Sequence, residues 1–190
     1  MAAAVGALAV VVFLLLNRAG SPGSVPQAAL RAAEAAGCGD IETPAASAPG
    51  NQHAQPGEVV NPTQRPPTSG LHYGNRILPP TPHVYDQPVD EIAALHNLEH
   101  AYVVIYYRAD GKTALGEDVV RALAEIANAE DKVILAPAGD LQDGRSLVFA
   151  AWNKLWQCPA GVTAEQARTM ATGFVEAYRG TSNAPEPLAA

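Results

Sequence analysis

The sequence has few basic residues, and they are scattered. Its 190 residues include 12 lysines and arginines against 19 aspartates and glutamates, which gives a formal net charge of −7. It has no basic stripe interleaved with aromatic side chains, the usual mark of a nucleic-acid-binding surface. It also lacks a glycine-rich phosphate loop. These absences argue against nucleic-acid binding and nucleotide chemistry.

A nucleophile elbow is absent as well. Ser69 lies in Pro-Thr-Ser-Gly, which differs from the Gly-x-Ser-x-Gly turn of hydrolases. No acid is obviously paired with a histidine near it, as a catalytic triad would require. We therefore do not expect a serine hydrolase.

Cysteine is scarce, with only Cys38 and Cys158 in the chain. In a cytosolic protein two such distant cysteines are usually free thiols, whereas an oxidising compartment favours a disulfide. The N-terminal segment argues for export. We therefore predict a disulfide between Cys38 and Cys158.

Residues 1–16 form an uncharged run rich in alanine, valine and leucine, closed by Asn17-Arg18. As a helix this run would span about 24 Å, short of a bilayer core of about 30 Å. A cleaved signal peptide is disfavoured by the missing basic start and by Arg18-Ala19-Gly20, a poor cleavage site. We predict an uncleaved transmembrane anchor over residues 1–18, with the rest of the chain on the extracytoplasmic side, periplasmic or extracellular.

The distribution of proline separates an irregular N-terminal half of the chain from a regular C-terminal half, because most of the 16 prolines lie before Pro88. Residues 19–49 are predicted to be a linker with a short helix and Cys38, and residues 50–187 a single globular domain. Within that domain, residues 50–88 are an irregular proline-rich arm and residues 89–180 the core.

The core alternates between helical and strand-like periodicity. Helices are expected from a start at residues 88–91 to about residue 101, at 115–129 and at 163–178, with buried strands at 102–107 and 132–136 and a third strand at 146–151. This order predicts an α+β fold, a small sheet with helices packed on one face, in a ferredoxin-like or a thioredoxin-like layer.

Histidines dominate the candidate site. His96 and His100 are four residues apart and so share one helix face. His72 ends a stiff Pro-Pro-Thr-Ser-Gly loop and could supply a third nitrogen. Three imidazoles suit zinc or copper, and Glu99 is placed as a fourth ligand, an orienting group or a general base. The alternative is that these histidines are hydrogen-bonded core residues.

Other readings of the same residues are weaker. His53 and Tyr73 are secondary ligand candidates. Residues 96–100 also fit the H-x-x-E-H pattern of inverted zinc peptidases, with Glu176 downstream as a carboxylate. The motif adjoins a strand, the domain is too small for two lobes, and Glu176 is predicted to face solvent, so a peptidase is disfavoured.

Several segments together resemble the domain-of-unknown-function family numbered 3105, secreted or membrane-anchored bacterial proteins of unassigned activity. They cover most of residues 37–186 in the expected order. The segments are Ala36–Cys38, Asn51–His53, Pro66–Tyr73, His96–His100, Val103–Tyr107, Ala151-Trp152, Leu155–Cys158, Phe174–Gly180 and Ala184–Glu186.

The resemblance implies an N-terminal anchor or signal, a cysteine before each half of the domain, and a site with His72, His96 and His100. It implies no reaction. The family pattern has glycine after the Leu-Glu-His triplet, where this chain has Ala101. If that position needs a positive φ, alanine is strained there.

Together these features predict a membrane-anchored, metal-binding accessory protein rather than an enzyme. Copper or zinc is the expected ion, and a membrane protein complex the expected partner. The alternative is a non-catalytic structural subunit of such a complex, and a metal-dependent hydrolase comes third.

Overall fold

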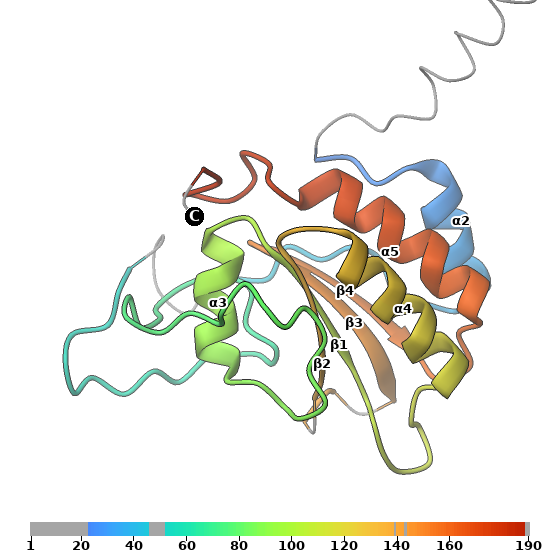
Figure 1. Cartoon of the computed structure of the whole chain (residues 1–190), viewed down its shortest axis with the longest axis horizontal. Helices are drawn as coiled ribbons and strands as arrows, with labels where there is room; N and C mark the ends of the chain where they lie inside the picture. The colour runs from blue at the N-terminus through green and yellow to red at the C-terminus, as the bar shows by residue number, and fades with distance from the viewer. Residues whose placement is uncertain (1–22, 46–51, 139, 143, 189–190) are drawn as a thin grey trace, which may run out of the picture.

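The computed structural model describes residues 23–45, 52–138, 140–142 and 144–188. In these ranges four helices surround one four-stranded sheet (Figure 1), which confirms the α+β class. The helices are α2 (Gln27–Ala35), α3 (Glu91–Glu99), α4 (Glu117–Ala129) and α5 (Ala164–Tyr178), and the strands are β1 (Val103–Tyr107), β2 (Val133–Pro137), β3 (Arg145–Ala151) and β4 (Lys154–Pro159).

The sheet is mixed, with the strand order β2-β1-β3-β4. Strands β1 and β2 are parallel, while β3 is antiparallel to β1 and β4 is antiparallel to β3. A parallel pair needs a crossover connection, and the amphipathic helix α4 provides it. The strands are almost wholly buried, because both faces of the sheet are covered.

Strand β4 is the one strand that the sequence pattern does not predict. It is joined to β3 by Trp152 and Asn153 alone, since Ala151 already pairs with Lys154. Asn153 has a φ of +55°, which asparagine adopts more readily than most residues. This turn contains neither glycine nor proline, so the usual signals of a hairpin are missing.

Helices cover both faces of the sheet, which corrects the prediction of a single helical face. Alternate residues of β1 point to opposite sides. Val103 and Ile105 join the core under α4 and α5, and Val104 and Tyr106 join a second core under α3. Figure 1 shows α3 on one side of the sheet and the other helices on the opposite side.

Helix α3 differs from a surface helix because seven consecutive residues, 93–99, are buried. The sheet covers one side, and the irregular segment of residues 52–88, hereafter the arm, wraps the other (Figure 1). The buried side-chain amide of Asn97 links α3 to the arm through hydrogen bonds. Its side chain accepts a hydrogen bond from the Leu78 N–H at 2.8 Å and donates one to the Leu78 carbonyl at 3.0 Å.

The predicted disulfide is present, joining Cys38 to Cys158 with a Cα separation of 4.1 Å. It connects the segment after α2 with strand β4. Helix α2 itself packs along α5, as Figure 1 shows. The two helices approach closely at Gly173, where an added Cβ would lie 2.6 Å from the Cβ of Ala29.

The predicted anchor, residues 1–18, lies outside the described residues. Among those that are described, no helix has the length and the apolar character needed to cross a membrane.

Ala101 has a φ of +61°, the left-handed conformation that favours glycine. It follows the last residue of α3 and its cap, His100. The Ala101 N–H donates to the Leu98 carbonyl, and the Tyr102 N–H donates to the Asn97 carbonyl. These two bonds form a Schellman motif, which usually has glycine at this position. Alanine is therefore strained here, as the family pattern implied.

Replacing Ala101 with glycine is expected to increase the free energy of unfolding by about 1 kcal/mol, because the left-handed conformation costs an alanine about 1–2 kcal/mol. Urea unfolding followed by circular dichroism measures the change. Ala109→Gly is the matched control, since Ala109 is exposed and its φ is not positive. It should lose stability or stay unchanged. A destabilised Ala101→Gly variant would contradict the assignment of strain.

Candidate metal centre

Three histidines and one glutamate converge where the arm meets the end of α3. One ligand atom from each of His53, His72, His96 and Glu99 lies within 4.8 Å of the others. The centre of the group is one oxygen of Glu99, Oε2. It lies 3.0 Å from His72 Nε2, 3.3 Å from His53 Nε2 and 3.7 Å from His96 Nε2.

His72 is held by the loop that precedes it. Residues 66–70 are buried, so this loop is part of the interior and not an ordinary surface loop. The Thr68 carbonyl accepts a hydrogen bond from the N–H of Asn153 in the β3–β4 turn, at 2.7 Å. Gly70 has a φ of +103°, which turns the chain so that its carbonyl lies 2.9 Å from His72 Nδ1.

Helix α3 contributes two side chains from one turn. His96 and Glu99 are three residues apart and therefore lie on the same face. The carbonyl of Arg76, from the arm, lies 3.0 Å from His96 Nδ1. Both sides of the site are thus positioned by backbone groups of the arm.

These backbone contacts determine the protonation of the rings. A carbonyl oxygen only accepts hydrogen bonds, so Nδ1 of His72 and of His96 must each carry a proton. In a neutral imidazole Nε2 then presents a lone pair, and both lone pairs face the same carboxylate oxygen of Glu99. Three acceptors around one point repel one another unless a positive charge lies between them.

The site is also desolvated. The side chains of His72 and Glu99 are 0% exposed, which makes an uncompensated charge on Glu99 costly. Burial lowers the pKa of His96, and His72 and His100 lower it further. The hydrogen bond to Arg76 and the charge of Glu99 act in the opposite direction. His96 therefore favours the neutral form that binds metals.

His53, a secondary candidate in the sequence, completes the group. It pairs with His72 in an isolated parallel bridge, so the two rings lie 4.9 Å apart. Its side chain is 46% exposed, and a cavity of about 390 Å³ lies beside it. The ring also packs against Gly74, where an added Cβ would lie 2.7 Å from His53 Nδ1. His53 is thus the solvent-accessible side of the site.

His100 lies beside the group but is not part of it. Its ring packs against His96 at 4.8 Å, while its Nε2 lies 3.8 Å from a carboxylate oxygen of Glu186. Tyr73 is also directed elsewhere, with its hydroxyl donating to the Glu58 carbonyl. Glu176 is exposed on α5, on the opposite face of the sheet from α3, so it contributes nothing to this site.

All four converging residues lie within one stretch of related sequence. Residues 53–190 match the family described as protein of unknown function (DUF3105). The chain belongs to the DUF3105 family. No curated protein and no solved structure matches it. The site of this DUF3105 protein therefore has to be interpreted from its own geometry.

The arm of the DUF3105 domain depends on Asn97. Asn97→Ala is expected to lower the free energy of unfolding by about 2 kcal/mol, because it leaves the N–H and the carbonyl of Leu78 without their partner. Urea unfolding measures this loss. The matched control is Asn61→Ala, because Asn61 is exposed and should change stability by less than about 0.5 kcal/mol. Equal midpoints for the two variants would contradict this role of Asn97.

Proposed function

We propose that this protein binds a copper or zinc ion through the Nε2 atoms of His53, His72 and His96 and the carboxylate of Glu99. One observation carries the proposal. Two buried imidazoles, each with its Nδ1 against a backbone carbonyl, turn their Nε2 atoms to the same buried carboxylate oxygen. When both rings are neutral, a metal cation at this point replaces the repulsion between their lone pairs and the carboxylate by four favourable bonds.

The surrounding contacts support the same conclusion. Histidines that bind metals generally donate their second ring nitrogen to a carbonyl or a carboxylate, which fixes the tautomer and the ring orientation. Both Gly70 and Arg76 provide such a carbonyl. Imidazole and carboxylate ligands suit zinc and copper, and three histidines with one carboxylate fill a four-coordinate site.

A binding or accessory role is favoured over catalysis. A metal-dependent hydrolase would need Glu99 beside a solvent-open pocket in order to activate water, yet its side chain is 0% exposed. The exposed edge of His53 offers a route for an ion to enter or leave. This arrangement fits a protein that holds or passes on a metal.

We further propose that the domain lies outside the cytoplasm, anchored by residues 1–18, and serves a larger membrane protein complex. The Cys38–Cys158 disulfide supports an oxidising compartment. The apolar composition of residues 1–16 supports the anchor. The competing proposal, a purely structural subunit, requires the histidines to be core residues.

Of the two folds suggested by the sequence, we infer a thioredoxin-like layer. A ferredoxin-like domain has the order β-α-β-β-α-β, with a helix between its last two strands. Here β3 and β4 are joined by two residues, and the last helix follows both strands.

Alanine variants of the histidines test the proposed ligand set. The full-length protein, purified in detergent, is loaded with zinc or copper and desalted, and its metal content is measured by elemental analysis. His53→Ala, His72→Ala and His96→Ala should each bind at least about tenfold more weakly, since even residues around a metal site contribute that much. His100→Ala should keep its metal, because its Nε2 faces Glu186.

His83→Ala is the control for the loss of an arm histidine, since His83 contacts the Val133 carbonyl away from the site. It should bind as tightly as the wild-type protein. Metal content that is the same in His83→Ala and His96→Ala, or absent from the wild-type protein, would falsify the proposal.

Gly74→Ala weakens the same site without removing a ligand. Its Cβ would lie 2.7 Å from His53 Nδ1 and so displace that ring. We expect zinc affinity to fall by about tenfold, measured by competition with a chromophoric chelator. Gly39→Ala is the control for a glycine without a positive φ, because its added Cβ would meet only the Gln157 carbonyl oxygen, at 4.0 Å. Unchanged affinity in Gly74→Ala would show that His53 is not a ligand.

A further inference from the structure

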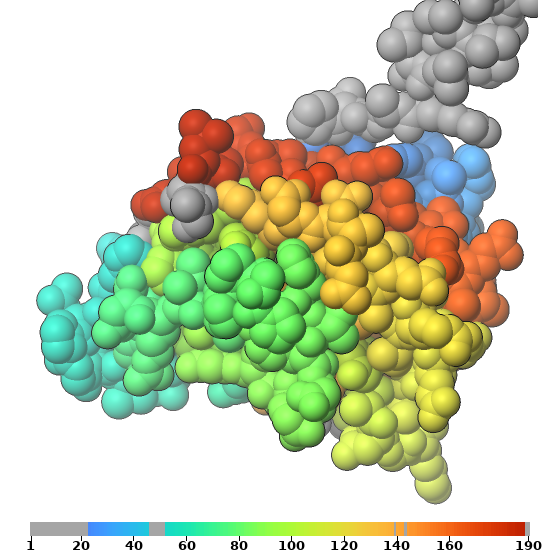
Figure 2. Space-filling view, viewed as in Figure 1, coloured from blue at the N-terminus to red at the C-terminus, as the bar shows by residue number. Residues whose placement is uncertain are grey.

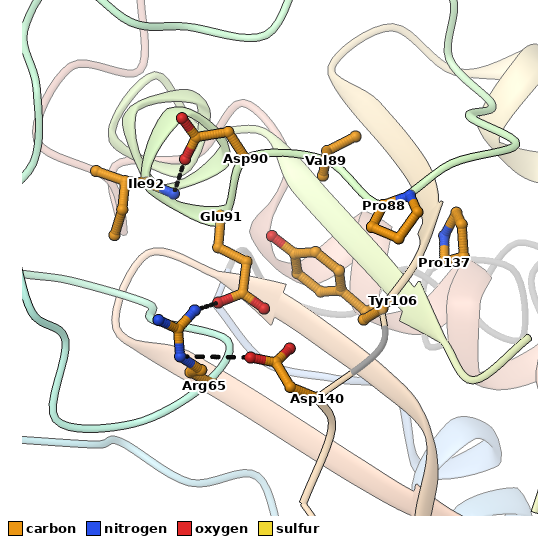
Figure 3. A pocket seen from close by; sticks show the side chains of 10 residues that line it. Arg65, Pro88, Val89, Asp90, Glu91, Ile92, Tyr106, Pro137 and Asp140 are labelled. Carbon is orange, nitrogen blue, oxygen red and sulfur yellow. Dashed lines mark hydrogen bonds and ion pairs between the residues drawn. The ribbon is translucent and has the colours of Figure 1, made fainter.

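A second cavity lies at the opposite end of α3 from the histidines. Its volume is about 350 Å³, and it opens between the start of α3 and the carboxyl ends of β1 and β2 (Figure 3). Tyr106 of β1 and Pro137 of β2 line it. In open sheets the carboxyl ends of parallel strands are a common place for ligands.

No hydrogen bond joins the hydroxyl of Tyr106 to another described residue, and this oxygen is not one of the fully buried polar atoms that lack a partner. Tyr106 is only 1% exposed, and Figure 3 shows its ring directed along the cavity toward the start of α3. The ring is buried, but the hydroxyl oxygen is accessible from the cavity that Tyr106 lines. It is therefore available to a molecule inside the cavity.

The charges that face the cavity are unbalanced. The guanidinium of Arg65 lies 2.7 Å from a Glu91 oxygen and 3.4 Å from an Asp140 oxygen, so one cation serves two carboxylates (Figure 3). Asp90 adds a third carboxylate, whose oxygens cap α3 and contact Arg76 at 3.6 Å. Burial, followed by the charge of Asp140, raises the pKa of Glu91 to about 7.

We propose that this cavity binds a small organic cation, a primary ammonium group carried on a short apolar stem. The ammonium would lie between Glu91 and the Tyr106 hydroxyl, donating to both. The stem would contact Pro88, Val89 and Pro137 on the apolar wall. Such a ligand supplies the missing positive charge and a partner for Tyr106 together.

Other ligand classes fit the cavity less well. An anion would be repelled by Glu91 and Asp140, which outnumber the one guanidinium. A bare metal ion would leave the apolar wall without a contact. The cavity is also separate from the metal site, since it shares no residue with the group of His53, His72, His96 and Glu99.

The experiment uses the full-length protein in detergent and n-butylammonium chloride as the probe. Isothermal titration calorimetry at pH 7 should show binding of n-butylammonium, while 1-butanol and butyrate bind at least tenfold more weakly. Because the cation favours ionised Glu91, binding should release protons, which titrations in buffers of different ionisation enthalpy detect. The absence of binding up to 100 mM, or equal binding of 1-butanol, overturns the proposal.

Two variants locate the site. Glu91→Gln should weaken n-butylammonium binding at least tenfold and abolish the proton release, and Tyr106→Phe should weaken binding severalfold while the proton release remains. Asp110→Asn is the control, an exposed carboxylate in a distant turn, and should bind like the wild-type protein. Wild-type affinity in Glu91→Gln would rule the site out.

Glu91→Gln is expected to fold. The folded-state pKa of Glu91, about 7, exceeds its ordinary value of 4.5. The ionised carboxylate is therefore less favourable in the folded chain than in the unfolded chain, and it reduces stability as pH rises from 4.5 through 7. The amide removes this penalty, so urea midpoints of the variant should vary less between pH 5 and pH 8 than those of the wild-type protein.

Discussion

The burial of the Glu99 carboxylate is the constraint around which this domain is arranged. A charge removed from water costs several kcal/mol unless nearby groups compensate it. Here the carboxylate lies among three imidazoles, two of them on the arm and one on the same helix as Glu99, and a cation shared by these four groups would supply the compensation. The arm must therefore be packed closely on α3. Its fastening through Asn97 and through the β3–β4 turn follows from this requirement.

The five residues of the short motif 96–100 divide four roles among them. His96 and Glu99 face the arm and form the site. Leu98 is fully buried in the core against the sheet, and Asn97 pairs with the backbone of Leu78. His100 ends the helix. A helix that is buried on all sides needs this division, because no side of it is left to solvent.

Much of the core was predictable from the sequence, because periodicity and β-branched runs report burial on a local scale. The conformation of the arm was not predictable, since it depends on contacts with residues that are distant in the sequence. This explains the exchange of His100 for His53. The i, i+4 spacing assumes a continuing helix, but the backbone at His100 has already left the helical region, with φ −87° and ψ 22°. His53 joins through its bridge with His72, a pairing that no local pattern encodes.

The two ends of α3 show how burial and the helix dipole compare in strength. The dipole favours anions at the start of a helix and cations near its end, by about 0.3–1 kcal/mol. At the C-terminal end of α3, the proposed cation beside Glu99 agrees with this preference. At the N-terminal end, ionised Glu91 has the charge that the dipole favours. Its pKa nevertheless rises from 4.5 to about 7, which corresponds to a free energy of about 3 kcal/mol against ionisation. Burial and Asp140 therefore outweigh both the dipole and Arg65. Only a further positive charge close to Glu91 would reverse that balance.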